Sequence, residues 1–138
     1  MIEIYTDGAY SSSRNQGGWA FVVVQNNKVI YKEYDGLINT TNNRMEIMGM
    51  LKALEWVKQN SIPLPIKIYT DSMYVIGTLT LNWKMKKNID LWQILIPLVN
   101  KDIDYLHVKG HDGNRFNEEC DKWAVFGSNL LNCKNDKE

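Results

Sequence analysis

Apolar and polar residues alternate from the start of the chain, and this pattern predicts β-strands. Isoleucines at positions 2 and 4 face one way and Asp7 faces the other, so residues 2–6 are expected to form a strand. A dense apolar run at 19–25 and a second alternation at 28–34 are separated by two asparagines, which are typical turn residues. We therefore expect three antiparallel strands arranged as a meander.

Helical spacing follows this meander. Residues 39–43 offer several capping side chains, and a helix is predicted over 44–60, with Pro63 and Pro65 beyond its end. The remaining elements alternate between strand and helix and are expected at 66–70 (strand), 71–79 (short helix), 90–97 (helix capped by Asp90), 103–108 (strand) and 115–130 (helix).

The order of these elements predicts the fold class. A strand–helix–strand alternation after the meander favours parallel pairing of the later strands. The expected architecture is α/β, with a mixed five-stranded sheet (three antiparallel strands, then two parallel additions) flanked by helices. We expect one domain over residues 1–130 and a polar, frayed tail over 131–138.

Composition and charge add only limits. The 138 residues carry 16 basic and 16 acidic side chains, so a basic surface for nucleic acid would have to be local. No apolar run is long enough to span a membrane and the N-terminus does not resemble a signal peptide, which together predict a cytoplasmic protein. Cys120 and Cys133 are expected to be reduced thiols there. We expect a monomer.

A repeated segment points to chemistry. "IYTDG" at 4–8 returns as "IYTDS" at 68–72, so Asp7 and Asp71 each end a predicted strand. On neighbouring parallel strands the two would lie ~4.8 Å apart, where like charges repel and a proton or a cation must settle the site. Each aspartate taken alone is also compatible with an ordinary turn or helix cap.

Two further carboxylates lie on helices. Glu46 falls at the centre of the apolar stripe of the helix at 44–60, and a core-facing carboxylate needs a partner or a metal; the alternative is a simple interaction with the helix dipole. Asp121 lies beside the apolar face of the last helix. Carboxylates without a histidine or cysteine cluster favour Mg²⁺ or Mn²⁺ over Zn²⁺, and two such ions would make a phosphoryl-transfer site.

Five segments, in register, resemble the type 1 ribonuclease H family over residues 2–128. They are "YTDGA" at 5–9, "GGWA" at 17–20, "TTNNRMEIM" at 40–48, "YTDSMYV" at 69–75 and "VKGHDGNRFNEECDKWA" at 108–124. The resemblance implies the ribonuclease H-like fold. It also implies endonucleolytic hydrolysis of the RNA strand in RNA–DNA hybrids, with 5′-phosphate and 3′-hydroxyl ends.

Specific residues acquire roles through this resemblance. Two Mg²⁺ ions, for which Mn²⁺ can substitute, are expected with substrate bound at the family's four carboxylate positions, which are Asp7, Glu46, Asp71 and Asp121. His111 matches the loop histidine that helps in proton transfer or product release; a solvated loop histidine is the alternative. Asn117 and Glu118 match positions that support the ligands. His107 matches no motif, and we expect it to be structural.

The resemblance also implies which residues contact the RNA–DNA hybrid. Thr41, Asn42 and Asn43 match the segment that touches the hybrid, and Gly8 a position where main chain approaches RNA. Two positions depart from common family residues, namely Met73 (often Gln) and Ser13 (often Asn in bacterial members). Both belong to the expected nucleic-acid contact surface.

The largest departure is the connector at 82–88, because many bacterial members carry a long basic handle there. Trp83 is expected to stack on a DNA sugar, and Lys84, Lys86 and Lys87 each to neutralise a phosphate. An ordinary solvated loop is the alternative. The short connector predicts weaker, more salt-sensitive hybrid binding than in handle-bearing relatives.

Three other functions compete with a free-standing ribonuclease H. They are a catalytically silent hybrid-binding module, a ribonuclease H domain of a reverse transcriptase, and another nuclease of the same fold, such as a resolvase or integrase. The complete carboxylate set argues against the first, because binding alone does not need negative charge beside phosphate. The initial methionine directly before the first strand argues against the second, and "TTNNRME" with "VKGHDGN" against the third.

Overall fold

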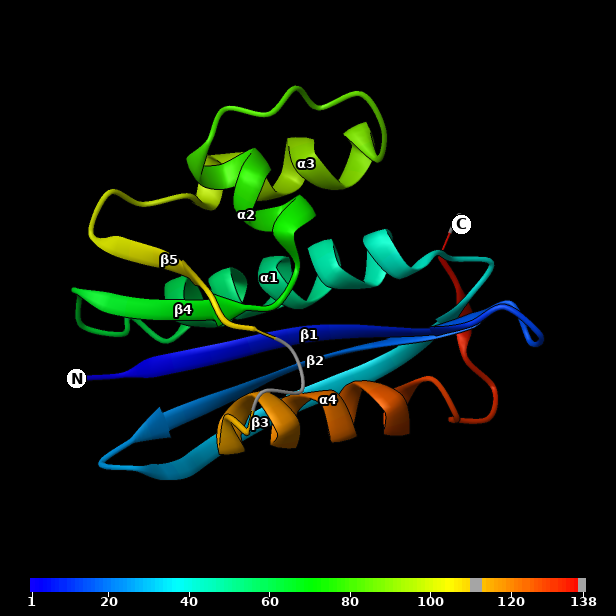
Figure 1. Cartoon of the computed structure of the whole chain (residues 1–138), viewed down its shortest axis with the longest axis horizontal. Helices are drawn as coiled ribbons and strands as arrows, with labels where there is room; N and C mark the ends of the chain where they lie inside the picture. Colours follow the sequence, from blue (N-terminus) through cyan, green and yellow to red (C-terminus); the bar gives the residue numbers. More distant parts are fainter. Residues whose placement is uncertain (110–112, 137–138) are drawn as a thin grey trace.

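The computed structural model describes residues 1–109 and 113–136, and it shows a mixed sheet between helices (Figure 1). The meander is formed by β1 (Glu3–Ser11), β2 (Gln16–Gln25) and β3 (Lys28–Ile38), paired antiparallel as the sequence predicts. Two parallel strands, β4 (Ile66–Thr70) and β5 (Ile103–His107), extend the sheet on the other side of β1.

A sixth strand was missed by the sequence analysis. β6 (Lys134–Asn135) pairs in parallel with Leu37 and Ile38 of β3, so the strand order is β5-β4-β1-β2-β3-β6. The expectation of a frayed tail is wrong for residues 134–136, because Asp136 donates its main-chain N–H to Ile38 O at 2.9 Å. A two-residue strand has too little periodicity to be seen in a sequence. The α/β class is otherwise confirmed.

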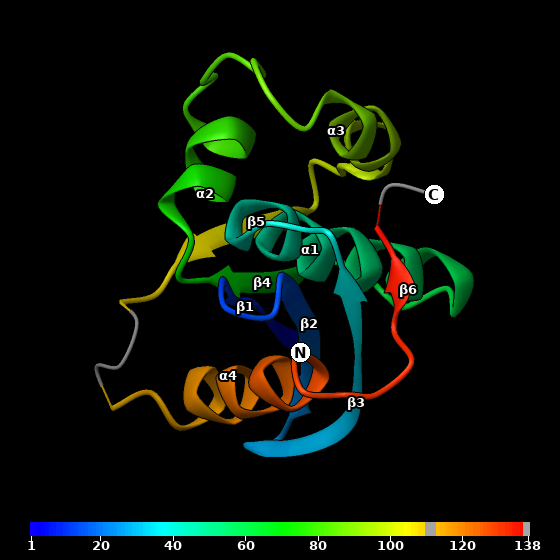
Figure 2. The ribbon, with the colours of Figure 1, turned by 90° about the vertical axis from the view of Figure 1, so that its right-hand side faces the viewer.

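The helices cover both faces of the sheet. Figure 2 shows α4 (Arg115–Gly127) on one face and α1 (Asn42–Gln59) on the other, with α2 (Met73–Thr80) and α3 (Ile89–Leu95) beyond α1. A short 3₁₀ helix, η1 (Ile96–Leu98), follows α3. Helix α1 begins two residues earlier than predicted, because Thr41 is its N-cap and accepts from Arg44 N–H.

The period-two alternation of the strands sorts side chains into two cores. Ile4, Phe21 and Ile68 pack beneath α1, whereas Tyr5 and Val22 pack against α4. Strand β1 is paired on both sides and covered on both faces, and its residues 4–7 are buried. Asp7 was predicted to end the first strand, but β1 continues to Ser11, and Asp7 instead follows the last residue of β1 that pairs with β4.

Candidate active site

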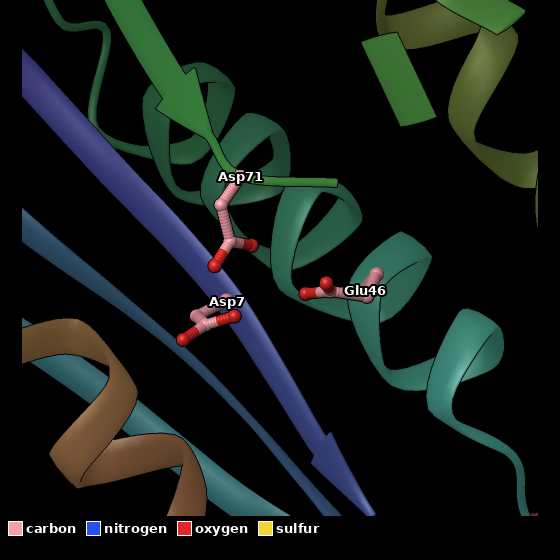
Figure 3. Close-up of side chains that lie close together, drawn as sticks. All are labelled: Asp7, Glu46 and Asp71. Carbon is pink, nitrogen blue, oxygen red and sulfur yellow. The ribbon is translucent and has the colours of Figure 1, made fainter. Parts of the chain in front are cut away.

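The two repeated segments lie side by side in the sheet. β1 and β4 pair in parallel, with Ile4 opposite Ile68 and Thr6 opposite Thr70. Asp7 and Asp71 are the next residues, and each points into the space where the pairing stops (Figure 3). The predicted adjacency of the two strands is confirmed.

Helix α1 brings Glu46 to the same place. The helix crosses β1 so closely that a Cβ on Gly8 would lie 2.5 Å from the main-chain nitrogen of Glu46. Only a glycine at this position lets the two backbones meet. Glu46 is 7% exposed and turns toward the two aspartates, so its predicted inward orientation is confirmed (Figure 3).

The three carboxylates form a compact group. One oxygen from each of Asp7, Glu46 and Asp71 lies within 4.8 Å of the others. Asp7 is 2% exposed, and its Oδ1 accepts the Gly8 N–H at 2.8 Å. Within residues 1–109 and 113–136, Asp7 Oδ2 and Glu46 Oε1 have no hydrogen-bond partner. Buried carboxylate oxygens without donors are costly unless something positive reaches them.

The pKa shifts of the buried carboxylates also favour a bound cation. Burial, followed by the charge of Glu46 and then that of Asp71, raises the pKa of Asp7. Burial and the charge of Asp71 likewise raise the pKa of Glu46. A divalent cation would remove both penalties by pairing with the charged forms. The all-oxygen donor set and the two unpartnered oxygens fit a hard ion such as Mg²⁺ or Mn²⁺.

Comparison with known proteins identifies the family. The family model described as RNase H matches residues 1–129. The chain belongs to the RNase H family. The family consists of metal-dependent endoribonucleases, so the expected enzyme class is confirmed.

Curated relatives named Ribonuclease H match over most of their length. The protein of Treponema denticola is 39% identical, with 90% of this chain and 94% of the relative covered. That of Hahella chejuensis is 41% identical over 91% of this chain and 92% of its own. The Rippkaea orientalis protein is 37% identical, with 99% of this chain and 90% of the relative covered.

Solved RNase H structures share the fold. The N-terminal RNase H domain of a Mycobacterium tuberculosis protein superposes with a TM-score of 0.79 at 20% identity, covering 92% of both chains. LC11-RNase H1, solved in complex with an RNA/DNA hybrid, gives 0.80 at 16% identity, covering 93% of this chain and 96% of its own. No helix in the described part of our chain is long and apolar enough to cross a membrane.

The fourth family carboxylate lies apart from this group. Asp121 is half-buried on α4, and it does not belong to the three residues whose oxygens lie within 4.8 Å of one another. The charges of all four carboxylates act on one buried group, the Cys120 thiol. Burial, and then the charges of Asp7, Glu46, Asp71 and Asp121, raise the pKa of the Cys120 thiol.

Residues expected to support the ligands take different positions. Asn117, one turn before Asp121, is buried, and its Oδ1 has no hydrogen-bond partner in the described part of the chain. Glu118 is exposed. His111 lies outside the described residues. His107, expected to be structural, is exposed at the end of β5, and its Nε2 lies 3.2 Å from the main-chain oxygen of Asp71.

The expected nucleic-acid segment lies next to the short connector. Thr41, Asn42 and Asn43 are exposed and line one cavity together with Lys87 and Asn88. Helix α1 has no acidic residue in its first turn, so its N-terminus presents a positive partial charge there. The cavity therefore combines features that attract an anion.

The other expected contacts are spread over a wider surface. Gly8 is half-buried against α1, while Ser13 is exposed in the β1–β2 turn and Met73 at the start of α2. In the connector, Trp83 is 46% exposed and packs its ring against Gly77, and the main-chain N–H of Trp83 donates to Gly77 O at 3.2 Å. Lysines 84, 86 and 87 are exposed. Trp83 thus fixes the connector to α2, and it leaves part of its ring available.

One group of charges was not anticipated. Asp90 was predicted to cap α3, but Asn88 is the N-cap and Asp90 instead pairs with Arg44 at 2.7 Å. Arg44 also pairs with Asp136 at 2.7 Å. No sequence signal announced this group, because a helical wheel places Arg44 on the polar side of its helix with Glu55 and Lys58, and its acidic partners lie 46 and 92 positions away.

Proposed function

We propose that the chain is a metal-dependent endonuclease that hydrolyses the RNA strand of RNA–DNA hybrids. The observation that carries the proposal is the group formed by Asp7, Glu46 and Asp71, which has two buried oxygens without donors. Membership of the RNase H family and the adjacent Thr41–Asn43 cavity support it.

The residues of this chain would divide the work. Asp7, Glu46 and Asp71 would hold divalent cations, with Asp121 completing the set from α4. Two bound Mg²⁺ ions would make the attacking water more acidic and offset charge on the phosphate. Water attacks phosphorus in line with the 3′-oxygen, and the P–O3′ bond breaks. The ends are then a 5′-phosphate and a 3′-hydroxyl. His111 would carry a proton near the leaving oxygen.

Hybrid recognition would use the surface beside the carboxylates. RNA is distinguished from DNA by contacts to 2′-hydroxyls, which the exposed amides of Asn42 and Asn43 can make. Main-chain N–H groups at the start of α1, with Lys87, would meet phosphate. Trp83 would stack on a sugar of the DNA strand. A monomer in the cytoplasm stays a prediction.

One cleavage experiment tests this proposal. An end-labelled RNA is supplied as an RNA–DNA hybrid, as a single strand and as duplex RNA, each with Mg²⁺, with Mn²⁺ and with chelator. We expect metal-dependent cutting of the hybrid alone, and its loss in Asp7→Asn. Hybrid binding without any cutting would overturn the proposal in favour of a silent binding module.

A further inference from the structure

Arg44 lies at the centre of a dense hydrogen-bond network. Its three guanidinium nitrogens donate five hydrogen bonds. Nε donates to Asp136, Nη1 to Asn88 and Asp90, and Nη2 to Asp90 and Asp136. The side chains of Arg44 and Asp136 are 9% and 3% exposed. Both charges are thus largely removed from water, and each depends on the other.

The network joins three segments that are distant in sequence. Arg44 belongs to the first turn of α1, Asn88 and Asp90 to the end of the connector and the start of α3, and Asp136 directly follows β6. Figure 2 shows β6 running alongside β3, and in Figure 1 the C-terminal segment approaches the start of α1. Asp136 also accepts the hydroxyl of Thr40 at 2.8 Å.

The segments held in this way are those that frame the substrate cavity. Thr40 and Arg44 flank Thr41–Asn43, and both are bonded to Asp136. Asn88 lines the cavity opposite, and Arg44 Nη1 donates to its Oδ1 at 3.3 Å. One guanidinium therefore sets the distance between the two walls, although it is not among the residues that line the cavity.

Stabilisation of the folded state does not by itself explain why the chain has such a network. The desolvation of buried charges cancels much of their attraction, so buried ion pairs often contribute little net stability. Their clearer effect is to select one arrangement of the groups they join. A cavity whose walls are already in place spares the hybrid the cost of ordering them on binding.

We propose that Arg44 and Asp136 are positioning residues for substrate binding, which hold the Thr41–Asn43 segment at a fixed distance from Lys87 and Asn88. This rests on the proposed function, because the ligand is taken to be an RNA–DNA hybrid. Asp136 lies seven positions beyond the last residue of the family match (136 − 129), so the family match says nothing about it.

The test separates binding from chemistry. KM and kcat are measured for two variants. Asp136→Asn removes the charge at nearly constant shape, and Arg44→Lys keeps the charge but replaces the planar guanidinium, with its several donors, by a single ammonium group. We expect KM to rise about tenfold in each, as the loss of one or two ordered contacts implies, while kcat stays within about twofold. The double variant is expected to show no further rise.

A matched control accounts for lost stability. Val57→Ala creates a small defect in the buried part of α1 far along the helix, and all variants are assayed below their melting temperatures. The control should lower the melting temperature without raising KM. Asp136→Asn and Arg44→Lys variants that melt earlier at an unchanged KM, or that lose kcat instead, would overturn the positioning role.

Direct binding keeps the two proposals distinguishable. Fluorescence anisotropy of a labelled hybrid reports affinity whether or not the chain cuts it. If the unaltered chain binds the hybrid without cutting, the proposed function fails, while weaker binding by both variants still supports positioning. If it cuts normally and both variants bind equally well, positioning alone fails.

Discussion

At the scale of single residues, Asp7 lies in unfavourable surroundings for a charged group. It is buried, it faces Glu46 and Asp71, and it receives one main-chain donor, from Gly8. Such a carboxylate opposes folding when ionised and helps only when a cation is present. The metal-free chain therefore carries a strain that its function explains and its packing does not.

Asp7→Asn should therefore stabilise the metal-free protein. Burial and repulsion raise the pKa of Asp7 in the folded state, so its ionisation disfavours folding. This penalty is absent below the ordinary carboxyl pKa of about 3.9 and grows as the pH rises above it. We expect the variant to gain about 1–3 kcal/mol near neutral pH and almost nothing near pH 4, as measured by urea unfolding.

Two comparisons make this prediction specific. Asp104→Asn removes an exposed carboxylate on β5 and should leave stability nearly unchanged. Added Mg²⁺ should raise the unfolding midpoint of the unaltered chain more than that of Asp7→Asn. Equal stability of the two chains from pH 4 to pH 8 would show that Asp7 is not under electrostatic strain.

Among the elements, α1 contributes most to the site. Its first turn supplies the expected hybrid contacts and Arg44, and its next residues supply Glu46. The whole helix is placed by its close approach to β1 at Gly8. A change in that one spacing would move Glu46 away from Asp7 and the cavity away from the connector at the same time.

Gly8→Ala should damage the site more than the fold. The added Cβ would lie 2.5 Å from main-chain atoms of Met45 and Glu46, so α1 must shift outward. We expect the Mg²⁺ concentration for half-maximal cleavage to rise and kcat to fall by about 100-fold, since a displacement near 1 Å can have that effect.

Gly36→Ala is the matched control. Its Cβ would lie 2.1 Å from the main-chain oxygen of Gly127, which is an even closer contact but involves the last residue of α4, six positions beyond Asp121. It should reduce stability while the folded fraction keeps its Mg²⁺ requirement. If both variants showed the same Mg²⁺ requirement, the contact at Gly8 would have no special role in placing Glu46.

The sequence predicted those features that arise from local periodicity. Alternation placed Asp71 directly after a strand and the helical wheel turned Glu46 inward, but the expected strand end at Asp7 was wrong, because β1 continues to Ser11. A wheel specifies a direction but no distance, so it could not show how far Asp121 lies from the other three carboxylates. The partners of Arg44 could not be predicted from the sequence, because Asp136 is 92 positions away and β6 is too short to show a periodic pattern.

For the whole molecule, the charge distribution matters more than the total. Basic and acidic residues balance, so the field that attracts nucleic acid must come from local groups such as Lys84, Lys86 and Lys87. A connector with few such groups predicts binding that is lost at lower salt than in handle-bearing relatives. The expectation of greater salt sensitivity applies to the salt concentration at which binding is lost and does not extend to the slope of affinity against salt, which should be shallower because it scales with the number of phosphates contacted.

Replacing the three connector lysines by alanine tests this surface. We expect hybrid affinity to fall, and the slope of log K against log salt to decrease by about 0.9 for each lysine that contacts a phosphate. Removing the same charge from three exposed lysines elsewhere, at positions 28, 58 and 101, should leave the slope almost unchanged. Anisotropy titrations between low and moderate salt give both values. Equal slopes for the two triple variants would assign hybrid binding to other residues.

The division of the carboxylates along the chain affects how activity arises during synthesis. Asp7 and Glu46 precede the loop at 61–65, and Asp71 follows it. A nascent polypeptide therefore lacks this three-carboxylate group until β4 has left the ribosome and docked beside β1, and Asp121 follows only with α4. Catalytic competence becomes a property of the completed sheet, and neither a stalled translation product nor a proteolytic half of the molecule carries it.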